Sequence, residues 1–227
     1  MKAATLSIVM PVLNEAASLS ETLRALALFT ARGVQLIVAD GGSSDDTVAL
    51  ARAAGAAVII APRGRALQMN TGAKCASAGM LLFLHADTLL PENADLMIAQ
   101  ALANGTFVWG RFDVRIAGQS LMLRLVAALM NLRSRWSGIA TGDQAMFMTR
   151  AAFDAVVGFP AQPLMEDIEI SRRLLQLSRP ACLTAKVQTS GRRWETRGVW
   201  RTVLLMWRLR FAYWRGAAPE HLAELYR

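Results

Sequence analysis

Apolar and polar residues follow one another along the first hundred residues in the pattern of strands that alternate with helices. Short apolar runs, such as 6–12 and 34–39, have the length of strands buried on both faces. Longer stretches with apolar residues at helical spacing separate these runs. This order predicts an α/β fold with a mostly parallel central sheet and helices on both faces. Strands are expected at 6–12, 34–39, 58–60 and 80–84, and helices near 16–30, 45–54, 65–78 and 92–103.

The remaining residues predict a less regular second half and a helical end. Partial alternation at 106–116 predicts an antiparallel strand, and two more strands are expected at 145–148 and 181–187. No linker or internal repeat interrupts the pattern, so a single domain is expected over 1–227. Helices are expected at 119–136, 151–157, 166–178, 198–215 and 220–226, with a loop at 137–144.

Two of the predicted strands end in a carboxylate. Asp40 follows an apolar run and precedes the turn 41–44, and Asp87 follows the run 81–84. In open α/β sheets ligands bind at the carboxyl ends of the strands, so the two acids predict one site. A metal-bound nucleotide fits, because Mg²⁺ or Mn²⁺ is usually held by one or two carboxylates and by phosphates. The alternative is that each Asp only caps the turn or helix that follows it.

The chain has no glycine-rich phosphate loop. The turn after the first strand, 11–15, contains no glycine, and no G-x-x-x-x-G-K-[ST] motif occurs. Basic side chains therefore have to meet the phosphates. Arg63 and Arg65 flank Gly64 at the start of the third predicted helix, where backbone N–H groups also favour anions. The alternative for these arginines is a solvated loop.

The content of hydrophobic residues and cysteines indicates where in the cell the chain is expected. Hydrophobic residues make up 54% of the chain, but arginines interrupt its apolar stretches, so no membrane-spanning helix is expected. Cys75 and Cys182 lie far apart without metal-ligand spacing and are interpreted as buried thiols in a reducing cytosol.

The basic charge is concentrated at the end of the chain. Residues 172–227 hold twelve Lys/Arg and three Asp/Glu. Arg197 and three arginines that each follow a tryptophan form one stripe on the expected helix, and the tryptophans form a neighbouring stripe. This pattern favours a helix on an anionic membrane surface. The alternatives are a helix that packs on the domain with its arginines in water, and a nucleic-acid or protein partner. The tryptophan–arginine pairs are Trp200–Arg201, Trp207–Arg208 and Trp214–Arg215.

Five segments, in this order, resemble the inverting nucleotide-sugar glycosyltransferases of family two, and in particular their small single-domain bacterial members. The resemblance covers about the first 180 residues. It implies the GT-A fold, with a nucleotide-binding half at 1–104, an acceptor and catalytic half at 105–187 and a basic helical tail at 188–227. The segments are SIVMPVLNEA (7–16), LIVADGGSSDDT (36–47), GRALQMNTGAKCASAG (64–79), LLFLHADT (81–88) and MEDIEISRRL (165–174).

The resemblance also implies a role for each matching residue. Asp87 is the last acid of the D-x-D motif, which reaches an Mn²⁺ or Mg²⁺ ion, but the first position of that motif is His85. We interpret His85 as a packed residue or a group behind the metal rather than as a ligand. The remaining roles are the nucleoside pocket for Pro11, Asn14 and Glu15, the base for Asp40, the donor diphosphate for Arg65 and Asn70, and the E-D pair for Glu166 and Asp167, whose Asp is the catalytic base.

The function that these roles imply is metal-dependent transfer of a sugar, with inversion, from a nucleoside diphosphate donor, UDP being the usual one. The acceptor is open, and a lipid-linked one would give a use to membrane contact. A cytoplasmic location at the inner face of the membrane is expected, without a nucleic-acid partner. The alternatives are a nucleotidyltransferase, which gives no reason for Glu166-Asp167, and a non-catalytic nucleotide-sugar-binding adaptor at the membrane, for which His85 is the only support.

Overall fold

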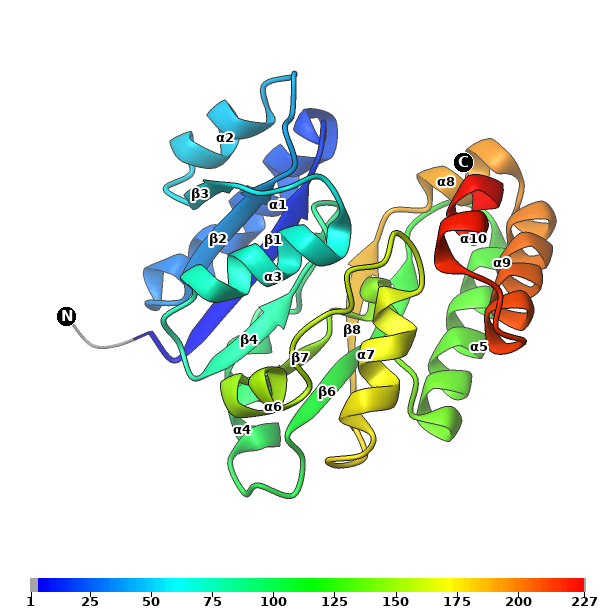
Figure 1. The fold of residues 1–227 in the computed structure, drawn as a ribbon. Helices are drawn as coiled ribbons and strands as arrows, with labels where there is room; N and C mark the ends of the chain where they lie inside the picture. The colour runs from blue at the N-terminus through cyan, green and yellow to red at the C-terminus, as the bar shows by residue number, and fades with distance from the viewer. Residues whose placement is uncertain (1–3, 227) are drawn as a thin grey trace.

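A single eight-stranded sheet runs through the chain in the order β3-β2-β1-β4-β7-β6-β8-β5 (Figure 1). The computed structural model describes residues 4–226, and the side chains of 193, 195 and 197 are left aside. Strands β3, β2, β1 and β4 are parallel, β7 is antiparallel to both of its neighbours, and β8 is parallel to β6 and antiparallel to β5. The strands are β1 Leu6–Val12, β2 Gln35–Asp40, β3 Ala57–Ile60, β4 Met80–Phe83, β5 Thr88–Leu89, β6 Trp109–Ile116, β7 Phe147–Thr149 and β8 Ala181–Thr189.

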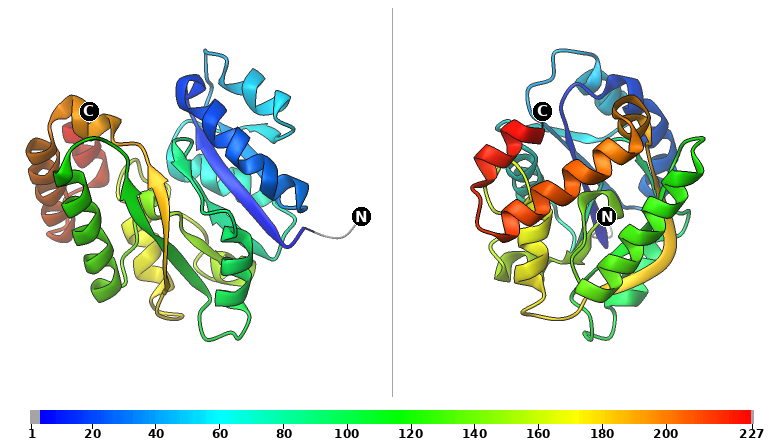
Figure 2. Two further views of the ribbon diagram at one scale, coloured as in Figure 1. Left: turned by 180° about the vertical axis from the view of Figure 1, so that it is seen from behind. Right: turned by 90° about the vertical axis from the view of Figure 1, so that its right-hand side faces the viewer.

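Helices cover both faces of this sheet, as the alternating pattern predicts (Figure 2). Along β1, Ile8 and Met10 pack in one buried cluster and Val9 in another, because successive strand residues point to opposite faces. The first cluster includes residues of α1, α4 and α5, and the second includes residues of α3, α6 and α7. The helices are α1 Ala16–Ala31, α2 Thr47–Ala53, α3 Arg65–Cys75, α4 Ala94–Leu102, α5 Leu121–Ser137, α6 Arg150–Ala155, α7 Glu166–Leu174, α8 Arg192–Arg197, α9 Val199–Trp214 and α10 Pro219–Tyr226, with a 3-10 turn η1 at Gly142–Gln144.

The predicted elements are confirmed, with differences that have local causes. Helix α3 ends at Cys75 rather than 78, and α7 ends at Leu174 rather than 178. Strand β5 and helix α8 were not predicted, because a two-residue strand and a six-residue helix are too short to show a period. The expectation of two buried thiols is wrong for Cys75, which is exposed; both cysteines are free.

The C-terminal helices pack on the segment that leads into α7. Leu209 of α9 and Leu222 of α10 form a buried cluster with Met165, the residue directly before α7. Arg197 belongs to α8, and Gly198, with φ 81°, separates it from α9, so the expected arginine stripe starts at Arg201. Among the described helices none is long and apolar enough to cross a bilayer.

Candidate functional site

The turns that follow β1 and β2 are joined to each other by hydrogen bonds. Asp40 is almost fully buried, and its carboxylate accepts hydrogen bonds from the backbone N–H groups of Gly42 and Ser43 and from Ser43 Oγ. These bonds show that Asp40 caps the turn that follows it, which was the alternative to a role in ligand binding. Recognition of a base by Asp40 stays a prediction. The rigid turn it holds lies at the sheet edge where ligands of α/β folds bind.

The turn after β1 is bonded to the turn after β2. Asn14 adopts φ 55°, accepts a hydrogen bond from the backbone N–H of Ser44 at 2.8 Å and donates its own backbone N–H to Ser43 Oγ at 2.9 Å. The backbone N–H of Glu15 donates to Thr47 Oγ1 at 2.8 Å. A positive φ outside glycine is uncommon and gathers at functional sites. The structure thus brings Asn14 and Glu15 together with Asp40.

Gln68 of α3 is a member of this region that the sequence analysis missed. Its side-chain N–H groups donate to the backbone carbonyls of Val12, at 2.7 Å, and of Ala39, at 2.9 Å. The buried amide therefore ties α3 to the ends of both β1 and β2. A Cβ at Gly41 would meet the Gln68 amide at 3.0 Å, so glycine fits this tight approach. Nothing in the local pattern of α3 distinguishes Gln68 from a solvent-facing glutamine.

A second group of side chains lies at the end of β4. His85 Nδ1 is 3.3 Å from a carboxylate oxygen of Asp143, and the imidazole packs against Gly142, where an added Cβ would lie 2.5 Å from Nε2. His85 is thus packed between Asp143 and Gly142, and its role relative to a metal stays a prediction. Asp87 is partly exposed, and within the described contacts its carboxylate accepts one long hydrogen bond, at 3.4 Å from Thr88 Oγ1.

The residues at this end fit a metal held together with a diphosphate. The described residues contain no group of three or more His, Cys, Asp or Glu side chains that could bind an ion by themselves. A site with one available carboxylate, Asp87, suits Mg²⁺ or Mn²⁺, because these ions commonly keep waters and take substrate phosphates as further ligands.

Asp167 is held in a fixed orientation. One oxygen of its carboxylate accepts the backbone N–H of Gly142 at 3.0 Å, and the other accepts the backbone N–H of Ile168 at 2.8 Å. Because His85 packs against Gly142, the turn η1 connects the end of β4 to Asp167. Met165, with φ 65°, starts the turn that presents the two acids. Asp143, in η1, is the link that the sequence analysis left without a role.

Glu166 is buried beside the basic residue of α3. Its carboxylate lies 3.7 Å from Arg65 Nη1, and the Arg65 side chain is half exposed. Burial disfavours the charged form of Arg65, but nearby groups outweigh this effect and raise the pKa of Arg65. Glu166 is the largest of these raising causes, followed by Tyr226, Asp143 and Asp167. Arg65 therefore lies near both acids and near the end of α10.

Burial raises the pKa of both acids of the pair. For Glu166 the negative charge of Asp167 raises the pKa further, while Arg65 lowers it in part. For Asp167 the hydrogen bond from Gly142 is the largest of the opposing causes, and it does not cancel the effect of burial. A carboxylate with a raised pKa is a better proton acceptor at neutral pH than an ordinary one.

Asn70 and Arg63, which were also expected near the diphosphate, do not share the position of Arg65 beside the acid pair. The amide of Asn70 is bonded to the backbone of Phe159, donating to its carbonyl at 2.8 Å and accepting from its N–H at 2.9 Å. These bonds explain Asn70 as a structural tie between α3 and the loop before α7; diphosphate contact stays a prediction. Arg63 is exposed, and Pro11 is half-buried in β1 beside Ala39 of β2.

Arg133 of α5 is a second residue that the sequence analysis missed. Its Nε and Nη2 atoms are buried and have no hydrogen-bond partner among the described residues. Burial lowers the pKa of Arg133, and the positive charge of Arg111 lowers it further. The negative charge of Asp167 acts in the opposite direction. A buried guanidinium near the acid pair with unused donors can bind an anionic group or a hydroxyl.

Replacing Glu166 by Gln is expected to stabilise the protein at neutral pH in the absence of ligand. Below the ordinary Glu pKa of 4.5 the carboxyl is neutral in both states and costs nothing. As the pH rises through the raised pKa of the folded state, ionising the buried group lowers the free energy of unfolding. Thermal unfolding between pH 4 and 8 should show a gain for Glu166→Gln, at roughly 2–4 °C per kcal/mol, that disappears toward pH 4.

Glu21→Gln, at an exposed position of α1, is the control for this prediction and should show no such pH dependence. A Glu166→Gln variant that is less stable than wild type at pH 7 to 8 would show that the contact with Arg65 outweighs the cost of burial.

Comparisons with known proteins identify this arrangement. The family model described as glycosyl transferase family 2 matches residues 7–156. No curated protein matches the chain. S. aureus TarS 1-349, also solved with UDP and with UDP-GlcNAc, has a TM-score of 0.66 and 16% identity over 82% of this chain and 60% of TarS 1-349.

A second solved structure is similar at the same level. Glucosyl-3-phosphoglycerate synthase from Mycobacterium tuberculosis, in complex with Mn²⁺, UDP and phosphoglyceric acid, has a TM-score of 0.60 and 18% identity over 81% of this chain and 69% of that one. The chain thus spans 60% of the length of the TarS structure. At these identities, the similarity to the two solved structures shows a shared fold. With the family match over most of its length, the chain belongs to glycosyl transferase family 2 and has the GT-A fold.

Proposed function

We propose that the protein transfers a sugar from a uridine diphosphate donor to an acceptor hydroxyl with inversion, with Asp167 as the base. The observation that carries this proposal is the fixed carboxylate of Asp167, bonded to Gly142 in the turn that packs on the strand end of His85 and Asp87. Structures of similar fold contain UDP, UDP-GlcNAc, or UDP with Mn²⁺, which supports the choice of donor and metal class.

The donor nucleoside lies, in this proposal, against the tied turns after β1 and β2. Pro11, Asn14 and Glu15 line the pocket, and the buried Asp40 holds the turn against which the base rests. Because these hydrogen bonds fix the two turns to each other, little backbone ordering is needed on binding.

Asp87 would hold a divalent cation, Mn²⁺ or Mg²⁺, together with the donor diphosphate. Such a cation would supply positive charge that offsets the charge of the leaving diphosphate. Arg65, half exposed and close to the acid pair, contributes a second positive charge near the same phosphates. His85 contacts Asp143 and steadies the turn behind this site.

Asp167 takes the proton from the acceptor hydroxyl as that oxygen attacks the sugar from the side opposite the diphosphate. Burial raises the pKa of this carboxyl, which makes it more basic than a solvated Asp and suits it to accept a proton. Glu166, buried beside Arg65, fixes the position of that arginine. Arg133, with two unused donors, is the residue of α5 best placed to meet a polar group of the acceptor.

The acceptor itself is left open by these contacts. A lipid-linked acceptor, and with it a cytoplasmic location at the inner face of the membrane, remains a prediction. It gains support from the exposed apolar residues of α5 and α9, because α9 also packs against Met165 through Leu209.

Release of nucleotide from a panel of nucleotide sugars tests the proposal. With Mn²⁺ or Mg²⁺ present, slow hydrolysis of one UDP-sugar to UDP is expected, and a chelator should stop it. Release of pyrophosphate from a nucleoside triphosphate and a sugar phosphate would instead favour a nucleotidyltransferase. Binding of a nucleotide sugar without turnover, with or without candidate acceptors, would favour a non-catalytic adaptor.

A further inference from the structure

Helices α5 and α9 each expose a stripe of large apolar side chains. On both helices these residues recur every three or four positions, which places them on one face. Each is between 51% and 85% exposed, far more than a core residue. The stripes are Leu121, Leu125, Leu129, Leu132 and Trp136 on α5, and Trp200, Leu204, Trp207, Phe211 and Trp214 on α9.

The two helices that carry these stripes lie on the same side of the molecule. Figure 1 shows α5 and α9 beside each other at one edge, and the side view in Figure 2 shows both in the foreground. We call the ten residues together the α5–α9 face. Large exposed apolar patches mark interaction sites in soluble proteins.

Neither helix can turn its stripe inward, because its opposite side is already packed. On α5, Asn131 binds both backbone groups of Val114 in β6, and Arg135 bonds with Asp113 at 2.7 Å. On α9, Leu209 is fully buried against Met165 and Leu222. The alternative in which the α9 tryptophans pack on the domain does not hold for Trp200, Trp207 and Trp214, which are exposed.

Positive charge borders the α5–α9 face. Neither α5 nor α9 contains an acidic residue. Arg201, Arg208 and Arg215 follow one edge of the α9 stripe, and Arg124 lies beside the α5 stripe; all four are exposed.

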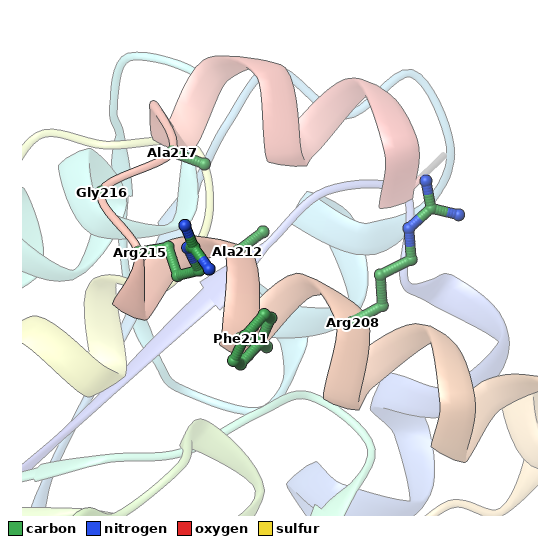
Figure 3. A pocket seen from close by; sticks show the side chains of 6 residues that line it. All are labelled: Arg208, Phe211, Ala212, Arg215, Gly216 and Ala217. Carbon is green, nitrogen blue, oxygen red and sulfur yellow. The ribbon is translucent and has the colours of Figure 1, made fainter.

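A shallow hollow lies at this border. Arg208, Phe211, Ala212 and Arg215 line it together with the turn at 216–217 (Figure 3). The Arg215 guanidinium lies over the Phe211 ring, 5.9 Å from its centre. Two guanidinium groups around an apolar floor suit a phosphate group joined to an acyl chain.

We propose that the α5–α9 face docks on the surface of an anionic lipid bilayer, with the tryptophans and leucines in the interface and the arginines on the head groups. Trp, Leu and Arg side by side on acid-free amphipathic helices are the composition of interfacial membrane helices. A second copy of the chain fits less well, since the arginines of the two copies would face one another. A nucleic acid would leave the ten apolar side chains in water.

The buried side of α9 makes this surface relevant to the site. Leu209 contacts Met165, one residue before Glu166, so the helix that docks on the bilayer also supports the turn carrying the acid pair. Docking would therefore hold the active site at a fixed distance from lipid head groups. This inference concerns where the proposed reaction takes place and does not depend on its chemistry.

Vesicle co-sedimentation tests the proposal with the full-length chain. Phosphatidylcholine vesicles with and without phosphatidylglycerol are compared at about 0.05 M and about 0.5 M salt, since salt screens charge but not apolar burial. The wild type should prefer the anionic vesicles at low salt and keep a smaller bound fraction at high salt. Arg201→Gln, Arg208→Gln and Arg215→Gln combined should abolish the preference.

The contribution of α5 has its own variants. Leu125→Gln with Leu132→Gln should weaken vesicle binding roughly tenfold or more at both salt concentrations, because two exposed apolar anchors are lost. The matched control is Leu28→Gln with Leu96→Gln, which changes equally exposed leucines on α1 and α4 and should bind like wild type. Hydrolysis of a UDP-sugar in solution, measured on the same samples, reports on the proposed chemistry separately.

Three results would overturn the inference. The first is no preference of the wild type for anionic vesicles at low salt. The second is equal loss of binding in the α5 variant and its control, which would show a general effect of surface leucines. The third is concentration-dependent dimerisation in light scattering that the α5 variant removes, which would assign the α5–α9 face to a second copy of the chain.

Discussion

Replacement of Asp167 by Asn is expected to lower turnover about 10²- to 10⁴-fold, the usual contribution of a positioned acid–base group, and to leave donor affinity nearly intact. Asn retains an oxygen that can accept the Gly142 or Ile168 hydrogen bond, but it cannot take a proton at neutral pH. Steady-state kinetics with the true acceptor should show the loss in kcat, and calorimetry should show donor binding close to that of wild type.

Glu169→Gln is the matched control for this variant. Glu169 lies on the same helix and forms ion pairs with Arg172 and Arg173 at the surface, so its replacement should leave kcat within a few-fold of wild type. If Asp167→Asn retains wild-type turnover, the base is Glu166 or another group. In wild type, kcat should fall as the pH drops through the raised pKa of Asp167, so its acid limb should lie above the ordinary Asp value of 3.8.

Replacement of Asp87 by Asn is expected to remove most of the metal dependence of donor binding. Asp87 is the partly exposed carboxylate at the end of β4, and one long bond from Thr88 leaves most of its lone pairs available. The loss of affinity should exceed the roughly 10- to 100-fold that removal of even an outer partner costs a metal site. Titration of UDP with and without Mn²⁺ measures it directly.

Asp154→Asn, an exposed acid of α6, serves as the control and should bind UDP and Mn²⁺ as wild type does. The Asp87 variant should unfold at a temperature close to that of wild type, because its carboxylate has little part in the packing. Unchanged metal-dependent affinity in Asp87→Asn would remove this residue from the site.

The sequence was sufficient to predict the central strands because buried strands have a simple signature. Apolar runs before Asp40 and Asp87 could be identified from composition and length. Asp40 is the last residue of β2, and Asp87 follows β4 and directly precedes β5. The acid pair was predictable only from the resemblance to family members, since acids are common in the first turn of any helix.

What the sequence did not predict depends on contacts between distant segments. The contact between His85 and Asp143 joins the loop after β4 to η1, and the unused donors of Arg133 become visible only when α5 is packed. Similarly, a helix was expected at 119–136, but its exposed apolar stripe was not, because one periodic pattern serves equally for a face turned to the core and one turned away.

The pairing of β5 with β8 has a consequence for how the protein reaches its final form during synthesis. Thr88, next to Asp87, pairs with Thr189, a residue about a hundred positions later. Contacts of such long sequence separation form late, and a domain generally folds as a unit. The backbone beside Asp87 therefore gains its strand partner only after β8 has emerged from the ribosome. A nascent chain that stops before β8 should lack the metal response expected of the full chain.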